Sequence, residues 1–242
     1  MPESKPTITT RISIAWLPDP PSEPTSTLVL STPNGRFVDI RLTLSLTHPS
    51  DIGACSLELA NAGTGTYGVD NDGRKWGRWT HEIDSRPGFS VGEKDVEEDM
   101  GWMRTLGNGD TLEEGRMKDS QGVLRDYEEI WRTTPIVDSA DKESGWKIVD
   151  SVEKGFEGSD AEKKIRAILG GRSTFRTVVM RVDRYAQGIL KVDSESQEKL
   201  TDAVVFRAER GTGTDSDAWK VVWSQNDLAI VKVLLSFVVE EN

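Results

Sequence analysis

The stretch FVDIRLTLSL, residues 37–46, alternates apolar and polar side chains from Val38 onward. Successive side chains of a β-strand point to opposite sides, so an alternating stretch has one apolar and one polar face. The apolar face carries Val38, Ile40, Leu42, Leu44 and Leu46, and the other carries Asp39, Arg41, Thr43 and Ser45. This pattern predicts a strand of an antiparallel sheet with one buried face and one face in water.

Short turns surround this strand and recur along the first half of the chain. Thr27–Ser31 reads as the preceding strand, and Pro33-Asn34-Gly35 joins the two, because Asn-Gly between apolar runs is a strong hairpin signal. Further glycine turns precede the predicted strands Lys75–Ile83, Thr111–Met117 and Val123–Trp131. Turns this frequent favour an antiparallel barrel or sandwich over a parallel sheet. Residues 93–106 fit either a helix or a strand.

The second half predicts a helix followed by strands. Ser159 and Glu162 have the spacing of a capping box, which predicts a short helix near 160–169. Residues 194–203 could form a second short helix. Five strands are predicted after residue 173, with Trp219, Val221 and Trp223 on one face: Thr174–Asp183, Ala186–Val192, Ala203–Glu209, Trp219–Ser224 and Leu228–Val239. We expect two domains, residues 1–137 and 146–242, joined by the polar linker 138–145.

Composition excludes several classes of function. The 242 residues carry a net charge of −11, of which −9 falls before residue 139. An acidic surface repels phosphate backbones and anionic lipid, so nucleic acid and membrane insertion are not expected. The single cysteine, Cys55, rules out an internal disulfide and a multi-cysteine metal site. The start of the chain shows no targeting pattern, and we expect a cytoplasmic protein.

Motifs for catalysis or cofactor binding are weak. His81 shares a face with Trp79 and Ile83, which favours a structural histidine held by a backbone partner over a catalytic one. The string Gly63–Gly68 looks like a phosphate loop but lacks a following helix, and we interpret it as a hairpin loop. Asp70–Gly73 is interpreted as a turn. We therefore expect no catalytic residues, no metal site and no cofactor.

Two other groups of residues are candidates for binding. The acidic run is either a solvated face or a docking patch for a basic partner, and its members are Glu93, Asp95, Glu97, Glu98 and Asp99. Large aromatic side chains fill small barrels or line apolar ligand pockets. We expect Trp79, Tyr127 and Trp131 inside the first barrel, and four-residue spacing places Tyr127 and Trp131 on one face of a strand.

One stretch resembles a known family. Residues 112–117, which carry glutamate and glycine, lead into Asp126–Pro135 with its pattern aromatic-x-Glu-x-Trp. This pair of strands is similar to the fungal Hri family, named for interaction with a casein-kinase-I-type kinase. Residues 28–42, 62–64 and 178–190 agree in order, so that the resemblance spans about residues 26–192.

The resemblance implies a mostly β fold of two calycin-like (lipocalin-like) antiparallel barrels with one or two short helices. It also implies a non-enzymatic interaction protein of the cytoplasm, and also of the nucleus, whose partner is a kinase of the casein-kinase-I type. The alternative is a carrier of a small apolar ligand inside an eight-stranded barrel. An enzyme that uses only aspartate and glutamate is a third reading.

Overall fold

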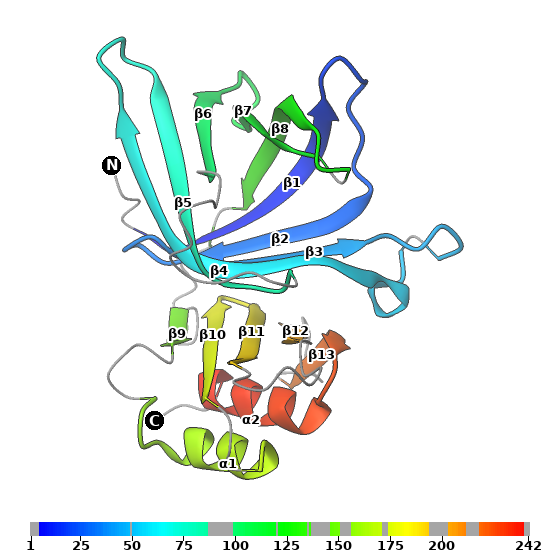
Figure 1. Cartoon of the computed structure of the whole chain (residues 1–242), viewed down its shortest axis with the longest axis vertical. Helices are drawn as coiled ribbons and strands as arrows, with labels where there is room; N and C mark the ends of the chain where they lie inside the picture. The colour runs from blue at the N-terminus through cyan, green and yellow to red at the C-terminus, as the bar shows by residue number, and fades with distance from the viewer. Residues whose placement is uncertain are drawn as a thin grey trace.

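The computed structural model is mostly β, with a closed barrel packed on a second, open sheet (Figure 1). It describes residues 5–48, 50–86, 99–119, 121–134, 136, 146–150, 156–170, 174–193, 203–211 and 218–239. The barrel has eight antiparallel strands in sequence order, and β1 closes it by pairing with β8. These strands are β1 (Thr7–Trp16), β2 (Thr25–Ser31), β3 (Arg36–Thr43), β4 (Ser56–Val69), β5 (Lys75–Asp84), β6 (Asp99–Thr105), β7 (Thr111–Lys118) and β8 (Leu124–Thr134).

The predicted turns of the barrel are confirmed. Gly35 and Gly109 have φ angles of 84° and 89°, a conformation that favours glycine and that the tight β2–β3 and β6–β7 turns require. Asp70 Oδ1 accepts hydrogen bonds from the backbone amides of Asp72 and Arg74, which fixes the β4–β5 turn. A short 3₁₀ helix, η1 (Ile52–Ala54), precedes β4.

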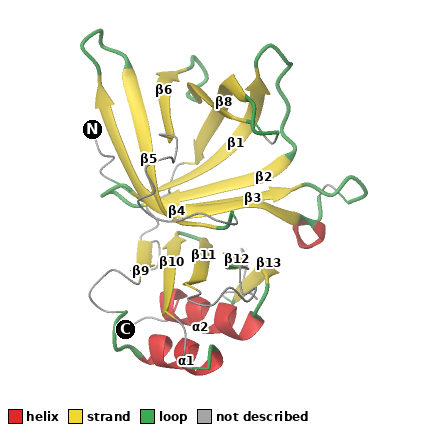
Figure 2. Cartoon of the chain, in the orientation of Figure 1, coloured by secondary structure: helices red, strands yellow, loops and turns green. Residues whose placement is uncertain are grey.

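The second unit is an open five-stranded antiparallel sheet with helices on one side (Figure 2). Its strand order is β13-β12-β11-β10-β9, so the expectation of a second barrel was wrong. The strands are β9 (Trp146–Asp150), β10 (Thr174–Val182), β11 (Tyr185–Asp193), β12 (Val204–Arg210) and β13 (Trp219–Gln225). The predicted helix is confirmed as α1 (Asp160–Ile168), where Ser159 Oγ accepts from the Glu162 amide at 3.1 Å.

Residues 228–239 form a helix, α2 (Leu228–Val239), and the prediction of a final strand there was wrong. Asp227 caps the helix, because its Oδ1 accepts hydrogen bonds from the amides of Ala229 and Ile230. The buried residues recur at helical spacing and pack on the sheet: Ile230, Val231, Leu234, Leu235 and Val238. The helix covers one face of the sheet, so this unit needs no closed barrel to bury that face.

The other face of the second sheet packs against the outside of the barrel. Val38, Ile40 and Leu42 are fully buried in this interface, and they contact a core that includes Val178 and Met180. The apolar face of β3 therefore lies outside the barrel, and the face predicted to be in water lies inside it. One hydrophobic core joins the two units, and a second core lies between the open sheet and its helices.

Buried polar side chains of the sheet bind the backbone of the barrel across this interface. Gln187 Nε2 donates to the carbonyls of Leu28 and Val38, both at 2.8 Å. Arg207 Nη2 donates to the carbonyls of Ser26 and Ile40 at 3.2 and 2.9 Å. These bonds fix the position of the sheet on β2 and β3, since apolar packing alone is not directional.

Three local expectations change. Gly63–Gly68 lies within β4 and is not a loop. A β-bulge between Arg207 and Ala208 changes the pairing with β13, so Trp223 faces the barrel while Trp219 and Val221 face the helices. Residues 99–105 form a strand. Residues 194–202 and the linker 138–145 lie outside the described residues, and the division into domains 1–137 and 146–242 stays a prediction.

Candidate functional site

The barrel interior contains a network of buried charges. Arg11 Nη1 donates to Glu129 Oε1 at 2.6 Å, and Arg11 Nε donates to Glu23 Oε2 at 2.8 Å. Arg41 Nη1 lies 3.7 Å from the same Glu129 oxygen, and Arg41 Nη2 donates to Asp39 Oδ2 at 2.8 Å. The strand register places Arg11 and Glu129 on the inner side of the barrel. Arg11 on β1 is directly opposite Trp131 on β8, and Glu129 on β8 is directly opposite Glu113 on β7. Each buried charge needs such a partner to offset its loss of hydration.

Two glycines make room for a second part of this network. Tyr127 Oη donates to Glu113 Oε1 at 2.8 Å. A Cβ atom at Gly115 would lie 2.5 Å from Tyr127 Oη, and one at Gly101 would lie 2.6 Å from Glu113 Cγ. Glycine at these two positions lets the long side chains of the neighbouring strands occupy the interior. This accounts for the glutamate–glycine pattern of residues 112–117.

Burial changes the protonation of these groups. Burial and the neighbouring Glu129 raise the pKa of Glu113 to about 8, although the hydrogen bond from Tyr127 opposes the shift. Burial also raises the pKa of Tyr127, and the nearby Glu113 adds to this effect. Burial raises the pKa of Glu129, and Arg41 and Arg11 oppose that shift. Glu113 is therefore largely protonated at neutral pH.

His81 lies between two carboxylates. Its Nδ1 is 3.2 Å from Asp84 Oδ2 and its Nε2 is 2.9 Å from Asp99 Oδ2. Burial alone would lower the pKa of His81, but the hydrogen bonds to Asp84 and Asp99 outweigh it and raise the pKa to about 9. Asp84 is also bound by Arg86 at 2.6 Å. His81 is thus a charged structural residue, and its carboxylate partners replace the backbone partner that we expected.

Some inward-facing side chains of the barrel are only partly buried, namely Thr9, Val29, Trp79 and Met103. Tyr67 lies edge-on to Trp79 with ring centroids 6.2 Å apart, and 43% of Tyr67 is exposed. The interior is therefore not buried equally throughout: these side chains retain contact with solvent, whereas Arg11, Asp39, Glu113 and Glu129 are buried.

The outer face of β5 and β6 carries a pair of tryptophans with arginines on them. Trp76 and Trp102 are directly opposite each other across the two strands, and both are partly exposed. The Arg74 guanidinium lies 4.0 Å from the Trp102 ring centroid, and that of Arg78 lies 5.6 Å from Trp76. We call these four residues the Trp–Arg face. The β4–β5 hairpin that carries part of it extends away from the second sheet (Figure 1).

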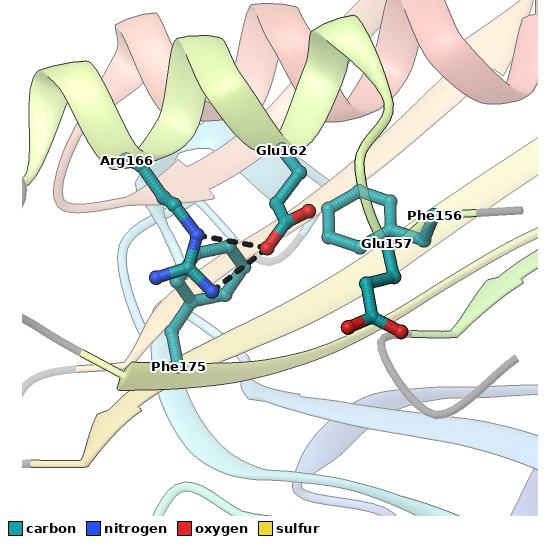
Figure 3. Close-up of a pocket in the computed structure, with 5 residues that line it drawn as sticks. All are labelled: Phe156, Glu157, Glu162, Arg166 and Phe175. Carbon is teal, nitrogen blue, oxygen red and sulfur yellow. Dashed lines mark hydrogen bonds and ion pairs between the residues drawn. The ribbon is translucent and has the colours of Figure 1, made fainter.

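A small cavity of about 130 Å³ lies beside α1 and is lined by Phe156, Glu157, Glu162, Arg166 and Phe175 (Figure 3). Glu162 points toward Arg166, and their oxygen and nitrogen atoms are 2.7 Å apart. The Gly158 amide donates to the other Glu162 oxygen at 2.5 Å. Glu162 and Arg166 thus already have partners, and we do not assign a ligand to this cavity.

The two groups of candidate residues predicted from the sequence, the interior aromatics and the acidic run, do not form one site in the structure. Tyr127 and Trp131 are buried on the inner face of β8, and Trp79 lies on the inner face of β5. Asp99 faces inward and binds His81, so it is not part of an outer patch. Glu93, Asp95, Glu97 and Glu98 lie outside the described residues. Among the residues described, no group of three or more metal-ligand side chains could hold an ion, and no helix is long and apolar enough to span a membrane.

Sequence reasoning missed the interior charges. Asp39 and Arg41 alternate with apolar residues, and Glu113 and Glu129 each stand beside a second glutamate. Solvent-facing charges show the same patterns, so nothing in one strand alone distinguishes the two cases. One signal was available. A glycine in the interior of each of two successive strands, Gly101 and Gly115, indicates a close approach of neighbouring groups, and the structure places the two opposite each other on β6 and β7.

Comparisons with known proteins agree with this architecture. A solved structure titled "Crystal structure of uncharacterized protein YLR301w", from Saccharomyces cerevisiae, matches with a TM-score of 0.63 and 16% sequence identity. The match covers 93% of this chain and 87% of that one, and at this identity it supports the fold alone. No curated protein matches the sequence. The family model described as Protein HRI1 matches residues 7–231. With nearly the whole length matched, this chain belongs to the HRI1 family.

Proposed function

We propose that this protein is a non-catalytic binding protein of the cytoplasm and nucleus, and that its partner is a kinase of the casein-kinase-I type. The observation that carries the proposal of a protein partner is the Trp–Arg face. Tryptophan and arginine are the residues most enriched among those that dominate binding energy at protein interfaces. A guanidinium stacked on an indole gains a cation–π attraction. Arg74 Nε also donates to Asp70 Oδ2 at 3.0 Å, which helps to hold the side chain over Trp102. The kinase class follows from the family resemblance.

The interior supports a non-catalytic role. Both ring nitrogens of His81 are engaged by carboxylates, and Glu113 is held by Tyr127. A general base must instead reach a substrate with a pKa near the working pH. The charged interior also argues against the alternative of an apolar ligand, which would have to cover Arg11, Arg41 and Asp39 without replacing their hydration.

Binding of the purified full chain to a casein-kinase-I catalytic domain tests the proposal. We expect Trp102→Ala and Arg74→Ala each to weaken binding at least tenfold in biolayer interferometry, because such residues contribute about 2 kcal/mol or more when buried in an interface. Val123→Ser is the matched control, since Val123 is exposed in the β7–β8 turn, away from the Trp–Arg face. Unchanged affinity in both variants would place the interface elsewhere, and no binding by the parent would reject this kinase class.

The acidic run gives a second, kinetic test. We propose that the acidic run, now Glu93, Asp95, Glu97 and Glu98, steers a basic partner surface, since charges at the rim of an interface act mainly on the association rate. Glu93, Glu97 and Glu98 are the three positions to change. Reversal of all three to lysine should slow association and reduce its dependence on salt, with dissociation nearly unchanged. The control changes net charge equally by reversing Glu58, Asp126 and Glu157, which are exposed at other places. If the two triple variants associate equally fast, the run has no specific steering role.

A further inference from the structure

Three buried polar atoms inside the barrel lack a hydrogen-bond partner. They are Asp39 Oδ1, Asn61 Oδ1 and Trp131 Nε1. Their residues are 5%, 2% and 9% exposed. An unpaired buried donor or acceptor costs about 1–3 kcal/mol, so native proteins rarely keep several together without a ligand or water that pairs with them.

Contacts through Arg41 and across β3 and β4 connect the residues of these three atoms. Asp39 and Asn61 are directly opposite each other on β3 and β4, and both face inward. Arg41 lies two residues from Asp39 on the same face, and its guanidinium is 6.0 Å from the centroid of the Trp131 ring. The second oxygen of Asp39 is bound by Arg41, which leaves Oδ1 for another donor.

The chemistry of the three atoms specifies a ligand. A carboxylate oxygen and an amide oxygen accept hydrogen bonds, and together they favour a positively charged donor. The indole N–H donates, so it needs an acceptor on the same ligand. Trp79 and Met103 also face the interior, and both are partly exposed.

We propose that the barrel interior binds a small organic ammonium compound that also carries a hydroxyl group. Its ammonium donates to Asp39 Oδ1 and Asn61 Oδ1, and its hydroxyl oxygen accepts from Trp131 Nε1. This site is separate from the Trp–Arg face, so it stands whether or not the protein partner proposed above is correct.

Ethanolamine is the probe, and three molecules of matched size are its controls. Ethylamine lacks the acceptor, ethylene glycol lacks the charge, and glycolate reverses it. We expect ethanolamine to bind the full chain saturably in the millimolar range and to shift one indole N–H resonance in ¹⁵N NMR spectra. Trp131→Phe should remove that resonance and identify it. Ethylamine should bind several-fold more weakly, and ethylene glycol and glycolate should not bind.

Asp39→Asn should weaken ethanolamine binding at least tenfold, whereas Asp110→Asn should leave it unchanged, because Asp110 lies in the β6–β7 turn and pairs with Arg132. If Asp39→Asn does not fold, the probe series with the parent and Trp131→Phe decides. Equal binding of ethylene glycol would overturn the ammonium assignment in favour of a neutral polyol. A lack of saturable shifts with all four probes would mean that water alone fills the site, and would overturn the proposal.

Discussion

Ile40 and Arg41 are consecutive in β3 and lie in opposite environments: Ile40 is buried in the core between the barrel and the second sheet, and Arg41 faces into the barrel, where it binds Asp39 at 2.8 Å. The same strand therefore supplies the apolar contact that joins the two units and the charges of the interior. Arg207 reinforces this arrangement, since it donates to the Ile40 carbonyl from the second sheet.

Ile40→Ala should destabilise the whole protein by about 2–5 kcal/mol, because the cavity would lie in the core that both units share. Urea unfolding followed by circular dichroism measures this, and a single shifted transition is expected. Ile12→Ala is the matched control, since 38% of Ile12 is exposed. Two separate transitions, of which only one shifts, would show that the units fold independently.

Glu129→Gln should cost about 3–5 kcal/mol, because it keeps the side-chain shape but leaves the buried Arg11 and Arg41 without their shared carboxylate. Asp126→Asn removes a carboxylate from the same strand, but its 3.5 Å pair with Arg116 is exposed and should contribute about 0.5 kcal/mol or less. Thermal unfolding compares the two. Equal losses of stability in the two variants would mean that the interior ion pairs of Glu129 stabilise the fold no more than an exposed ion pair does.

Stability should fall as the pH rises from about 6.5 to 9. The folded pKa of His81, about 9, is above its unfolded value of 6.5, so its contribution is complete below pH 6.5 and lost as the pH approaches 9. This contribution is of the order of 3 kcal/mol. Glu113 acts in the same direction between 4.5 and about 8, because only the unfolded chain releases that proton there.

His81→Asn should flatten the dependence of the free energy of unfolding on pH in this range. His48→Asn is the control, because His48 is the other histidine and is exposed. Urea unfolding at intervals of half a pH unit gives the slopes. A slope that persists in His81→Asn would assign the effect to Glu113 or to other groups.

Gly115→Ala should destabilise the barrel by about 1–3 kcal/mol, since the added Cβ would lie 2.5 Å from Tyr127 Oη and force that ring out of place. Gly107→Ala is the matched control, because a Cβ there meets no atom within 4 Å. Melting temperatures measure the difference, and near-ultraviolet circular dichroism reports the Tyr127 environment. A fully stable Gly115→Ala would show that the strands can separate to accept it.

Local chemistry alone determined much of the fold. The Asn-Gly and Asp-Gly turns and the capping box at Ser159 were read correctly, because each depends on residues close together in the chain. The alternation in residues 37–46 correctly predicted a strand but extended it too far, since β3 ends at Thr43 and Leu46 is exposed. Mostly antiparallel β structure and the position of α1 follow from these signals. The resemblance to this family was also visible in the pair β7 and β8, of which β8 carries Tyr127 and Trp131.

Tertiary structure alone decided which face of each strand is inside. Alternation shows that the faces of β3 differ, but a barrel packed on a sheet buries both of them, so the charged face became the interior. The same reason explains Leu228–Val239, which is apolar enough for a buried strand or a buried helix. It became α2 because one face of the open sheet had to be covered. The first strands that form this face begin more than fifty residues earlier in the chain, so the sequence of the segment alone does not reveal them.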